Sequence, residues 1–168
     1  MNVYRRVLLV AIAVALIAFG GAPIAGAQSG APPWAACGRT DPETKVAKTY
    51  PVQPPIGGPA RTYAVLQCGN DKYGYRHIAD KHGQEWSDLA VLTGGPWQSL
   101  ADFAITQTLT VPQPGYPQYD AGRNTWTYKS PLQIKDRDGQ ARATYWVVIG
   151  VAAQDGKVLT GFYTRDPR

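Results

Sequence analysis

The chain has 168 residues and a formal net charge of +5, with 17 lysines and arginines against 12 aspartates and glutamates. This mildly basic balance favours a phosphate backbone over an acidic surface as a partner. The charge is too small for the chain to be a polycation. The P-loop, GxGxxG, GxSxG and HExxH motifs are absent from the sequence, and serine is scarce. The sequence therefore gives no indication of a P-loop enzyme, a dinucleotide-binding domain, a serine hydrolase or a zinc protease.

The amino terminus has the parts of a signal peptide. Arg5 and Arg6 precede an apolar run over residues 7–19, and Ala-Gly-Ala at residues 25–27 predicts cleavage before Gln28. The apolar run is shorter than the roughly 20 residues that span a bilayer, which argues against the alternative of an uncleaved anchor. We therefore expect residues 1–27 to be removed, and the product to be secreted, free of the membrane and charged +3 after the loss of two arginines.

Residues 28–60 are rich in proline and glycine, which predicts an extended leader rather than a separate domain. Cys37 and Cys68 are the two cysteines of the chain, and both lie in the exported part. An even pair in an oxidising compartment predicts one disulfide, in preference to a reactive thiol or a metal site. This disulfide would tie the leader to the segment that carries both histidines.

Ordered structure is predicted to begin with a strand over residues 61–67. Asn70 and Asp71 are good N-cap residues for a helix that runs to His82, with Gly83 as its C-terminal stop.

A short helix over residues 86–92 and a longer one from Pro96 to about Val111 follow. Residues 112–122, with three prolines, predict a loop. Strands are predicted over residues 125–128, 132–134, 141–152 and 157–164, the last two joined by an Asp-Gly turn. Residues 61–168 are therefore predicted to form one α+β domain, with N-terminal helices packed on a C-terminal antiparallel β-sheet.

The two histidines of the chain, His77 and His82, lie five residues apart. On an ideal helix, five steps of about 100° place them about 140° apart. We therefore expect the two rings to diverge unless the last turn unwinds at Gly83. The spacing also argues against a zinc site, for which a separation of four residues is typical.

Two segments resemble bacterial ribonuclease toxin domains of the barnase, EndoU, colicin and RelE-like class, which include CdiA-type C-terminal toxins. Residues 74–83 (GYRHIADKHG) are similar to the G-x-x-H-I-x-x-K/R-H segment of that class, and residues 147–162 to its closing hairpin, which ends in V-x-T-x-Y. Phe162 departs from this pattern, because it stands where the class often has a tyrosine.

The resemblance implies a metal-independent endoribonuclease that cleaves RNA by histidine general acid/base transphosphorylation, with no cofactor. It makes His82 the first candidate for proton transfer and His77 the second, with Lys81 or Arg76 as charge stabiliser and Thr160 as a hydrogen-bond donor to phosphate. Further candidates for substrate contact are Arg76, Arg142, Tyr163 and Arg165. RNA and a cognate inhibitor protein are the expected partners of a monomer.

A second hypothesis is a secreted or envelope-associated binding protein on the same scaffold, without catalysis, which the loss of the hydroxyl at Phe162 favours. A third, an enzyme inhibitor, depends only on size, export and the disulfide. Residue by residue, the alternatives are a hydrogen-bonded core position for His82, a solvent-facing position for His77, and surface charges for Lys81 and Arg76.

Overall fold

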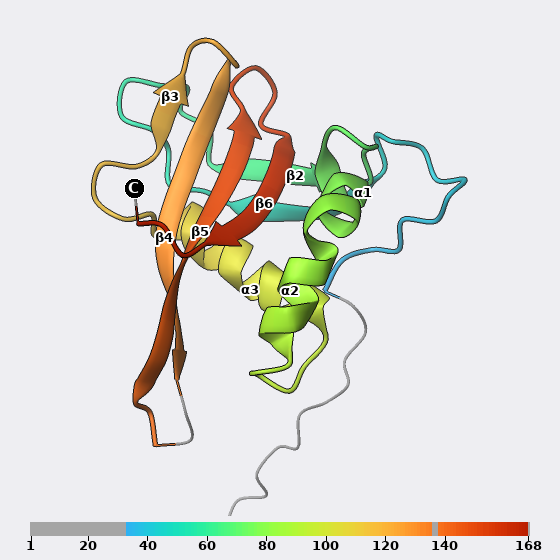
Figure 1. The fold of residues 1–168 in the computed structure, drawn as a ribbon. Helices are drawn as coiled ribbons and strands as arrows, with labels where there is room; N and C mark the ends of the chain where they lie inside the picture. The colour runs from blue at the N-terminus through green and yellow to red at the C-terminus, as the bar shows by residue number, and fades with distance from the viewer. Residues whose placement is uncertain (1–32, 136–137, 168) are drawn as a thin grey trace, which may run out of the picture.

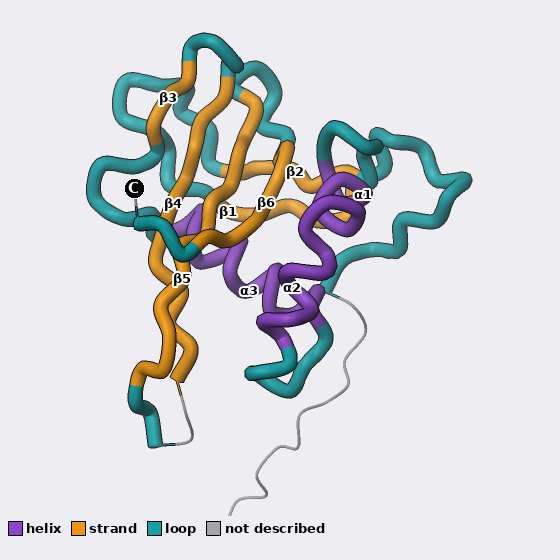
Figure 2. Tube along the Cα trace, viewed as in Figure 1, coloured by secondary structure: helices purple, strands orange, loops and turns teal. Residues whose placement is uncertain are grey.

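The computed structural model describes residues 33–135 and 138–167, which form an α+β fold with two antiparallel sheets (Figures 1 and 2). The predicted signal peptide and its cleavage site lie outside these residues. No helix within them is long and apolar enough to cross a membrane. The elements in chain order are β1 (Val46–Pro51), β2 (Tyr63–Gln67), α1 (Gly74–His77), the π-helical turn η1 (Ile78–His82), α2 (Gly83–Ala90), α3 (Trp97–Thr110), β3 (Gln118–Asp120), β4 (Thr125–Lys135), β5 (Ala141–Ala152) and β6 (Val158–Thr164).

The main sheet has the strand order β3-β4-β5-β6, and every neighbouring pair is antiparallel. The predicted strands over residues 125–128 and 132–134 are one continuous strand, β4, with Pro131 inside it. Proline is tolerated there because β3 pairs with β4 only as far as Thr127, so Pro131 lies on an edge that needs no backbone donor. β5 has the predicted bounds, and β6 begins one residue later than expected.

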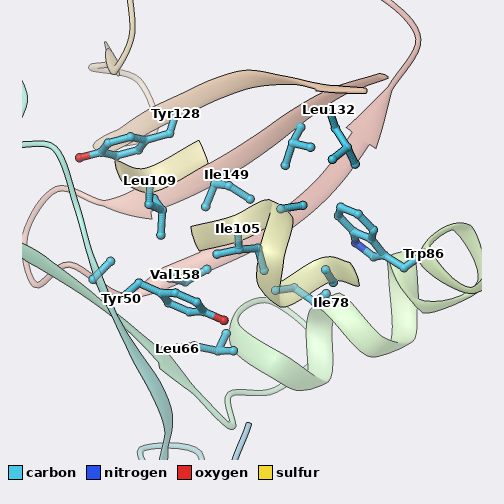
Figure 3. Packing of buried hydrophobic residues seen from close by; sticks show 14 of the residues in the cluster. Tyr50, Leu66, Ile78, Trp86, Ile105, Leu109, Tyr128, Leu132, Ile149 and Val158 are labelled. Carbon is cyan, nitrogen blue, oxygen red and sulfur yellow. The ribbon is translucent and has the colours of Figure 1, made fainter. Parts of the chain in front are cut away.

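The helices lie on one face of the main sheet and leave the opposite face without a helix over it (Figure 1). The buried side chains between them come from β1, β2, η1, α2, α3 and the strands of the main sheet (Figure 3). The largest fully buried ones include Tyr50, Leu66, Ile78, Trp86, Ile105, Leu109, Ile149 and Val158. Strand alternation then divides β6: Gly161 packs toward Ile105 on the helix side, so Thr160 and Phe162 lie on the open face.

The leader is more ordered than its prolines predict. Residues 46–51 form β1, which pairs antiparallel with β2, and Tyr50 and Trp34 are buried in the core. The prediction that ordered structure begins at residue 61 is therefore wrong. Pro51 is the last residue of β1 and the other prolines of the leader lie outside the strand, so none of them interrupts the ladder.

Cys37 and Cys68 form the predicted disulfide, with their Cα atoms 5.3 Å apart. It joins the chain before β1 to the end of β2, next to the loop that leads into α1.

The predicted helix from Asn70 to His82 is wrong at both ends. Asn70 accepts the Lys72 N–H at 2.8 Å within a turn, and the helix begins at Gly74. Gly83 has helical φ and ψ angles of −60° and −37°, so the chain continues through it into α2. The prediction of a second long helix is confirmed: α3 covers residues 97–110, with Pro96 as its N-cap.

Candidate active site

The π-helical turn brings the two histidines together. The ring centroids of His77 and His82 are 5.6 Å apart, with an angle of 75° between the ring planes. The expectation that the rings diverge is therefore wrong, because it assumed α-helical geometry throughout. A π-turn forms its hydrogen bonds between residues five apart, so residues 77 and 82 fall on one side of the helix.

Each imidazole is oriented through its Nδ1 atom. His77 Nδ1 lies 2.8 Å from the Asp71 carbonyl oxygen, which can only accept, so Nδ1 carries the hydrogen and Nε2 keeps the lone pair of the neutral ring. His82 Nδ1 lies 3.3 Å from a carboxylate oxygen of Glu85, which sets the same tautomer. Both rings therefore have Nε2 as the atom available for proton exchange with a substrate.

Phe162 connects the histidines to the open face of the sheet. Its ring stacks on the His82 ring at 5.2 Å between centroids and 24° between planes. On the sheet, Phe162 pairs with Val148 of β5 and lies two residues beyond Thr160. The sequence showed Phe162 only as a missing hydroxyl, although strand alternation from Thr160 already places the two residues on one face.

Two hydrogen bonds between α2 and β6 fix this arrangement from the core side. Trp86 Nε1 donates to the Gly161 carbonyl at 3.0 Å, and the Tyr163 hydroxyl donates to the Glu85 carbonyl at 2.9 Å. Both bonds join the helix that follows His82 to the strand that carries Phe162. They therefore hold the His82 ring over Phe162.

A cavity of about 330 Å³ lies on the open face beside Phe162. Thr160 lines it, and the Thr160 Oγ1 is buried without a hydrogen-bond partner among the described residues. The lining comes from the turn between β3 and β4 and from three strands: Asp120, Arg123, Thr125, Thr127, Val148, Gly150, Leu159, Thr160 and Phe162. The structure therefore places Thr160 on the face that the stacked His82 ring borders.

Lys81 is within the π-turn, but its contact is with a neighbour. Its Nζ lies 2.8 Å from the Asp80 carboxylate, and both side chains are exposed. The hydrogen bond from Lys81 and its positive charge lower the pKa of Asp80 below its ordinary value. Lys81 is thus a solvent-exposed charge near the histidines, without a contact that fixes it over them.

Arg76 is a structural clamp. Its guanidinium donates to the carbonyl oxygens of Gly69 at 2.7 Å, Gly38 at 2.5 Å and Asp41 at 2.8 Å. These bonds join the start of α1 to the segment around the disulfide. Three of the five N–H donors of the guanidinium are therefore used by backbone carbonyls, which favours a structural role for Arg76 over a phosphate contact.

Tyr163 and Arg165 lie on the helix side of the sheet. The Tyr163 ring packs against Trp86 at 5.3 Å, and the Arg165 guanidinium lies 5.8 Å from the centre of the Tyr145 ring. Burial, reinforced by the negative charge of Glu85, raises the pKa of Tyr163. Neither residue shares a face with Thr160, so the structure separates both from the histidine pair.

Arg142 lies near the start of β5, at the projecting end of the β4–β5 hairpin. It is eight residues before Gly150, about 26 Å along an extended strand. The structure does not bring it to the candidate site. No group of three or more histidine, cysteine, aspartate or glutamate side chains suited to a metal ion occurs in the part of the chain that is described.

Comparison with known proteins adds relatives without a described activity. No model of a protein family matches the chain. Uncharacterized proteins of Mycobacterium tuberculosis, from the CDC 1551 and H37Rv strains, are each 34% identical to it over 137 residues. The match covers 77% of this chain and 48% of each relative, so the chain spans about half the length of these curated relatives.

Proposed function

We propose that this chain is a secreted endoribonuclease that cleaves RNA by proton transfer through His77 and His82, without a metal ion. The observation that supports this most is the convergence of the two imidazoles at 5.6 Å, each oriented through Nδ1. Cleavage of RNA without metal needs a base for the 2′-hydroxyl and an acid for the leaving 5′-oxygen. Two neighbouring imidazoles supply both groups near neutral pH.

We assign the base to His77, whose Nδ1 faces a neutral carbonyl, and the acid to His82, whose Nδ1 faces the Glu85 carboxylate. His77 Nε2 takes the proton of the ribose 2′-hydroxyl while the 2′-oxygen attacks the phosphorus. The bond from phosphorus to the 5′-oxygen breaks, and His82, which enters as the imidazolium, donates a proton to that oxygen. The products are a 2′,3′-cyclic phosphate and a free 5′-hydroxyl, and one imidazole gains the proton that the other loses.

The open face contributes positive charge and hydroxyl groups around the phosphate. Lys129, which lies two strands from Phe162 through its pairing with Val148, is 3% exposed and donates from Nζ to the Pro167 carbonyl at 3.0 Å, so it supplies a fixed positive charge and no direct phosphate contact. Lys81 is an exposed charge near the histidines that pairs with Asp80, and Thr160 adds a buried hydroxyl at the cavity. Charges and donors that are held in place before reaction stabilise the negative charge of the transition state.

The proposal is tested by incubating the disulfide-bonded chain with total RNA in EDTA, beside the variants His82→Ala and Lys72→Ala. Lys72 is an exposed residue of the loop that precedes α1 and serves as the control. We expect the wild type and Lys72→Ala to cleave RNA, and His82→Ala to lose at least a hundredfold in rate, the usual effect of removing a general acid or base. Equal cleavage by His82→Ala and the wild type contradicts the proposal. Absence of cleavage by the wild type supports the binding protein instead.

A further inference from the structure

We propose that the cavity beside Phe162 binds an unpaired nucleobase of the substrate, which makes the enzyme selective for single-stranded RNA. This inference rests on the proposed ribonuclease function and assigns the substrate class of the same site. The cavity is about 330 Å³, within the range of small-molecule sites in proteins. It lies on the open face between the β3–β4 turn and β6.

Gly150 lines the cavity near the end of β5, where the pairing of β5 with β6 shifts register. Its φ angle does not require glycine, since it is not among the glycines with positive φ. A Cβ atom at this position would lie 3.3 Å from Thr160 Cγ2 and 3.7 Å from Thr125 Cγ2. The missing side chain therefore lets the methyl groups of Thr160 and Thr125 pack over Gly150, and a larger residue here would push them into the cavity.

The walls match the two surfaces of a nucleobase. Val148, Leu159 and Phe162 offer apolar contact for the faces of a planar ring. Thr125, Thr127 and Thr160 carry hydroxyls, and the rim adds the Asp120 carboxylate and the Arg123 guanidinium, which can exchange hydrogen bonds with the polar edge of a base.

The Thr160 hydroxyl lacks a hydrogen-bond partner among the residues that the structure describes. Its Oγ1 is buried and receives no hydrogen bond from the described residues. Such a group is rare in native structures and destabilises the fold, so it calls for an explanation. A rotation about χ1 turns the hydroxyl into the cavity, where a base can satisfy it.

The position of the cavity relative to the histidines fits a nucleotide. Phe162 lines the cavity and also stacks on His82 at 5.2 Å. A base in the cavity therefore leaves its ribose and phosphate beside Phe162, within reach of the imidazoles. A base in a duplex cannot enter, because it would first have to leave its stack and its partner.

The test is an NMR titration of the disulfide-bonded chain with the four nucleoside 3′-monophosphates, and separately with inorganic phosphate. We expect at least one nucleotide to shift the amide signals of Gly150 and Thr160 and to bind at least tenfold more tightly than phosphate. Thr127→Trp, which places an indole in the cavity opposite Gly150, should reduce that affinity to the phosphate level. Thr164→Val, on the same face of β6 beyond the cavity, is the matched control and should bind as the wild type does.

Thr160→Val keeps the proposal testable if the tryptophan variant does not fold. We expect it to weaken nucleotide binding about five- to tenfold, the value of one hydrogen bond, without lowering the midpoint of thermal unfolding. Nucleotide binding no tighter than phosphate, or unaffected by both cavity variants, overturns the assignment.

The two proposals fail in different ways. A chain that cleaves RNA but shows no nucleotide in the cavity refutes the base site alone. If the chain binds a nucleotide in the cavity and His82→Ala retains that binding, but the wild type cleaves no RNA, the ribonuclease function alone is refuted.

Discussion

Tyr50 shows at the scale of single residues how the leader is held in the core. It is fully buried, and its hydroxyl donates to the Asp102 carboxylate at 2.8 Å, while Trp34 and Lys48 donate to the same carboxylate. Burial and the nearby negative charge of Asp102 raise the pKa of Tyr50 well above its ordinary value of 10.0. In the folded chain Tyr50 therefore stays neutral at alkaline pH.

This shift gives a stability prediction with a definite sign. Below about pH 10 Tyr50 is neutral in both states, and above it only the unfolded chain ionises, so folding stability falls as pH rises. Tyr50→Phe should lower the free energy of unfolding by about 1–2 kcal/mol at pH 7. That deficit should shrink above pH 10, as measured by urea unfolding at pH 7 and pH 10.5. The control is Tyr63→Phe, because Tyr63 is half-exposed. A loss of unfolding free energy in Tyr50→Phe that grows with pH contradicts the account.

Single residues differ in how far the sequence could predict their roles. The disulfide was predictable, because two cysteines allow one intramolecular pairing. The roles of Arg76 and Phe162 were not, because both depend on distant partners: Arg76 on carbonyls of Gly38 and Asp41, and Phe162 on the His82 ring. Long-range contacts of this kind leave no local pattern.

The π-turn is the element on which the candidate site depends. The sequence predicted one helix that ends at His82, with Gly83 as its stop, and a separate short helix over residues 86–92. The structure keeps one helical path and inserts a wider turn over Ile78–His82. Ile78 and Trp86, on either side of Gly83, are both fully buried. Sequence periodicity assumes a constant 3.6 residues per turn, so it cannot show such a change.

Removing the extra residue of this turn tests its geometry. Deletion of Ala79 should convert the π-turn into α-helix and place the two histidines four residues apart, about 40° from each other around the axis. We expect this variant to retain RNA cleavage, while an alanine inserted after Ala79 should abolish it by rotating the rings apart. The measurement is the cleavage rate beside the thermal midpoint. A deletion variant that keeps its midpoint but loses cleavage contradicts the role of the π-turn.

Strands and the longer helix were the elements best predicted from sequence. β5 and α3 have long, uninterrupted patterns and clear ends, at an Asp-Gly turn and at Pro96. β1 was missed because the prolines around it outweighed its short alternating pattern, and its pairing partner β2 decides its state.

At the scale of the whole molecule, the disulfide supports the candidate site from a distance. It closes a loop of 31 residues between the leader and β2, beside the carbonyls that bind Arg76. On the chain-entropy model this loop stabilises the fold by about 3–4 kcal/mol. His77 directly follows Arg76, so the same contacts hold the start of the histidine-bearing helix.

Replacing both cysteines, as Cys37→Ser with Cys68→Ser, should lower the free energy of unfolding by about 3–4 kcal/mol and reduce RNA cleavage at 37 °C. Urea unfolding and a cleavage assay on the same preparation measure the two effects. Dithiothreitol should reproduce both in the wild type and change neither in the serine variant. A serine variant as stable and as active as the wild type would show that the disulfide is dispensable to the site.

The most direct test of the central claim is the rate of RNA cleavage in EDTA by the wild type, His77→Ala, His82→Ala and the double variant. If the two imidazoles act as one base and acid unit, each single variant should lose nearly as much rate as the double variant. Losses that add independently, or a single variant with the wild-type rate, would contradict the account.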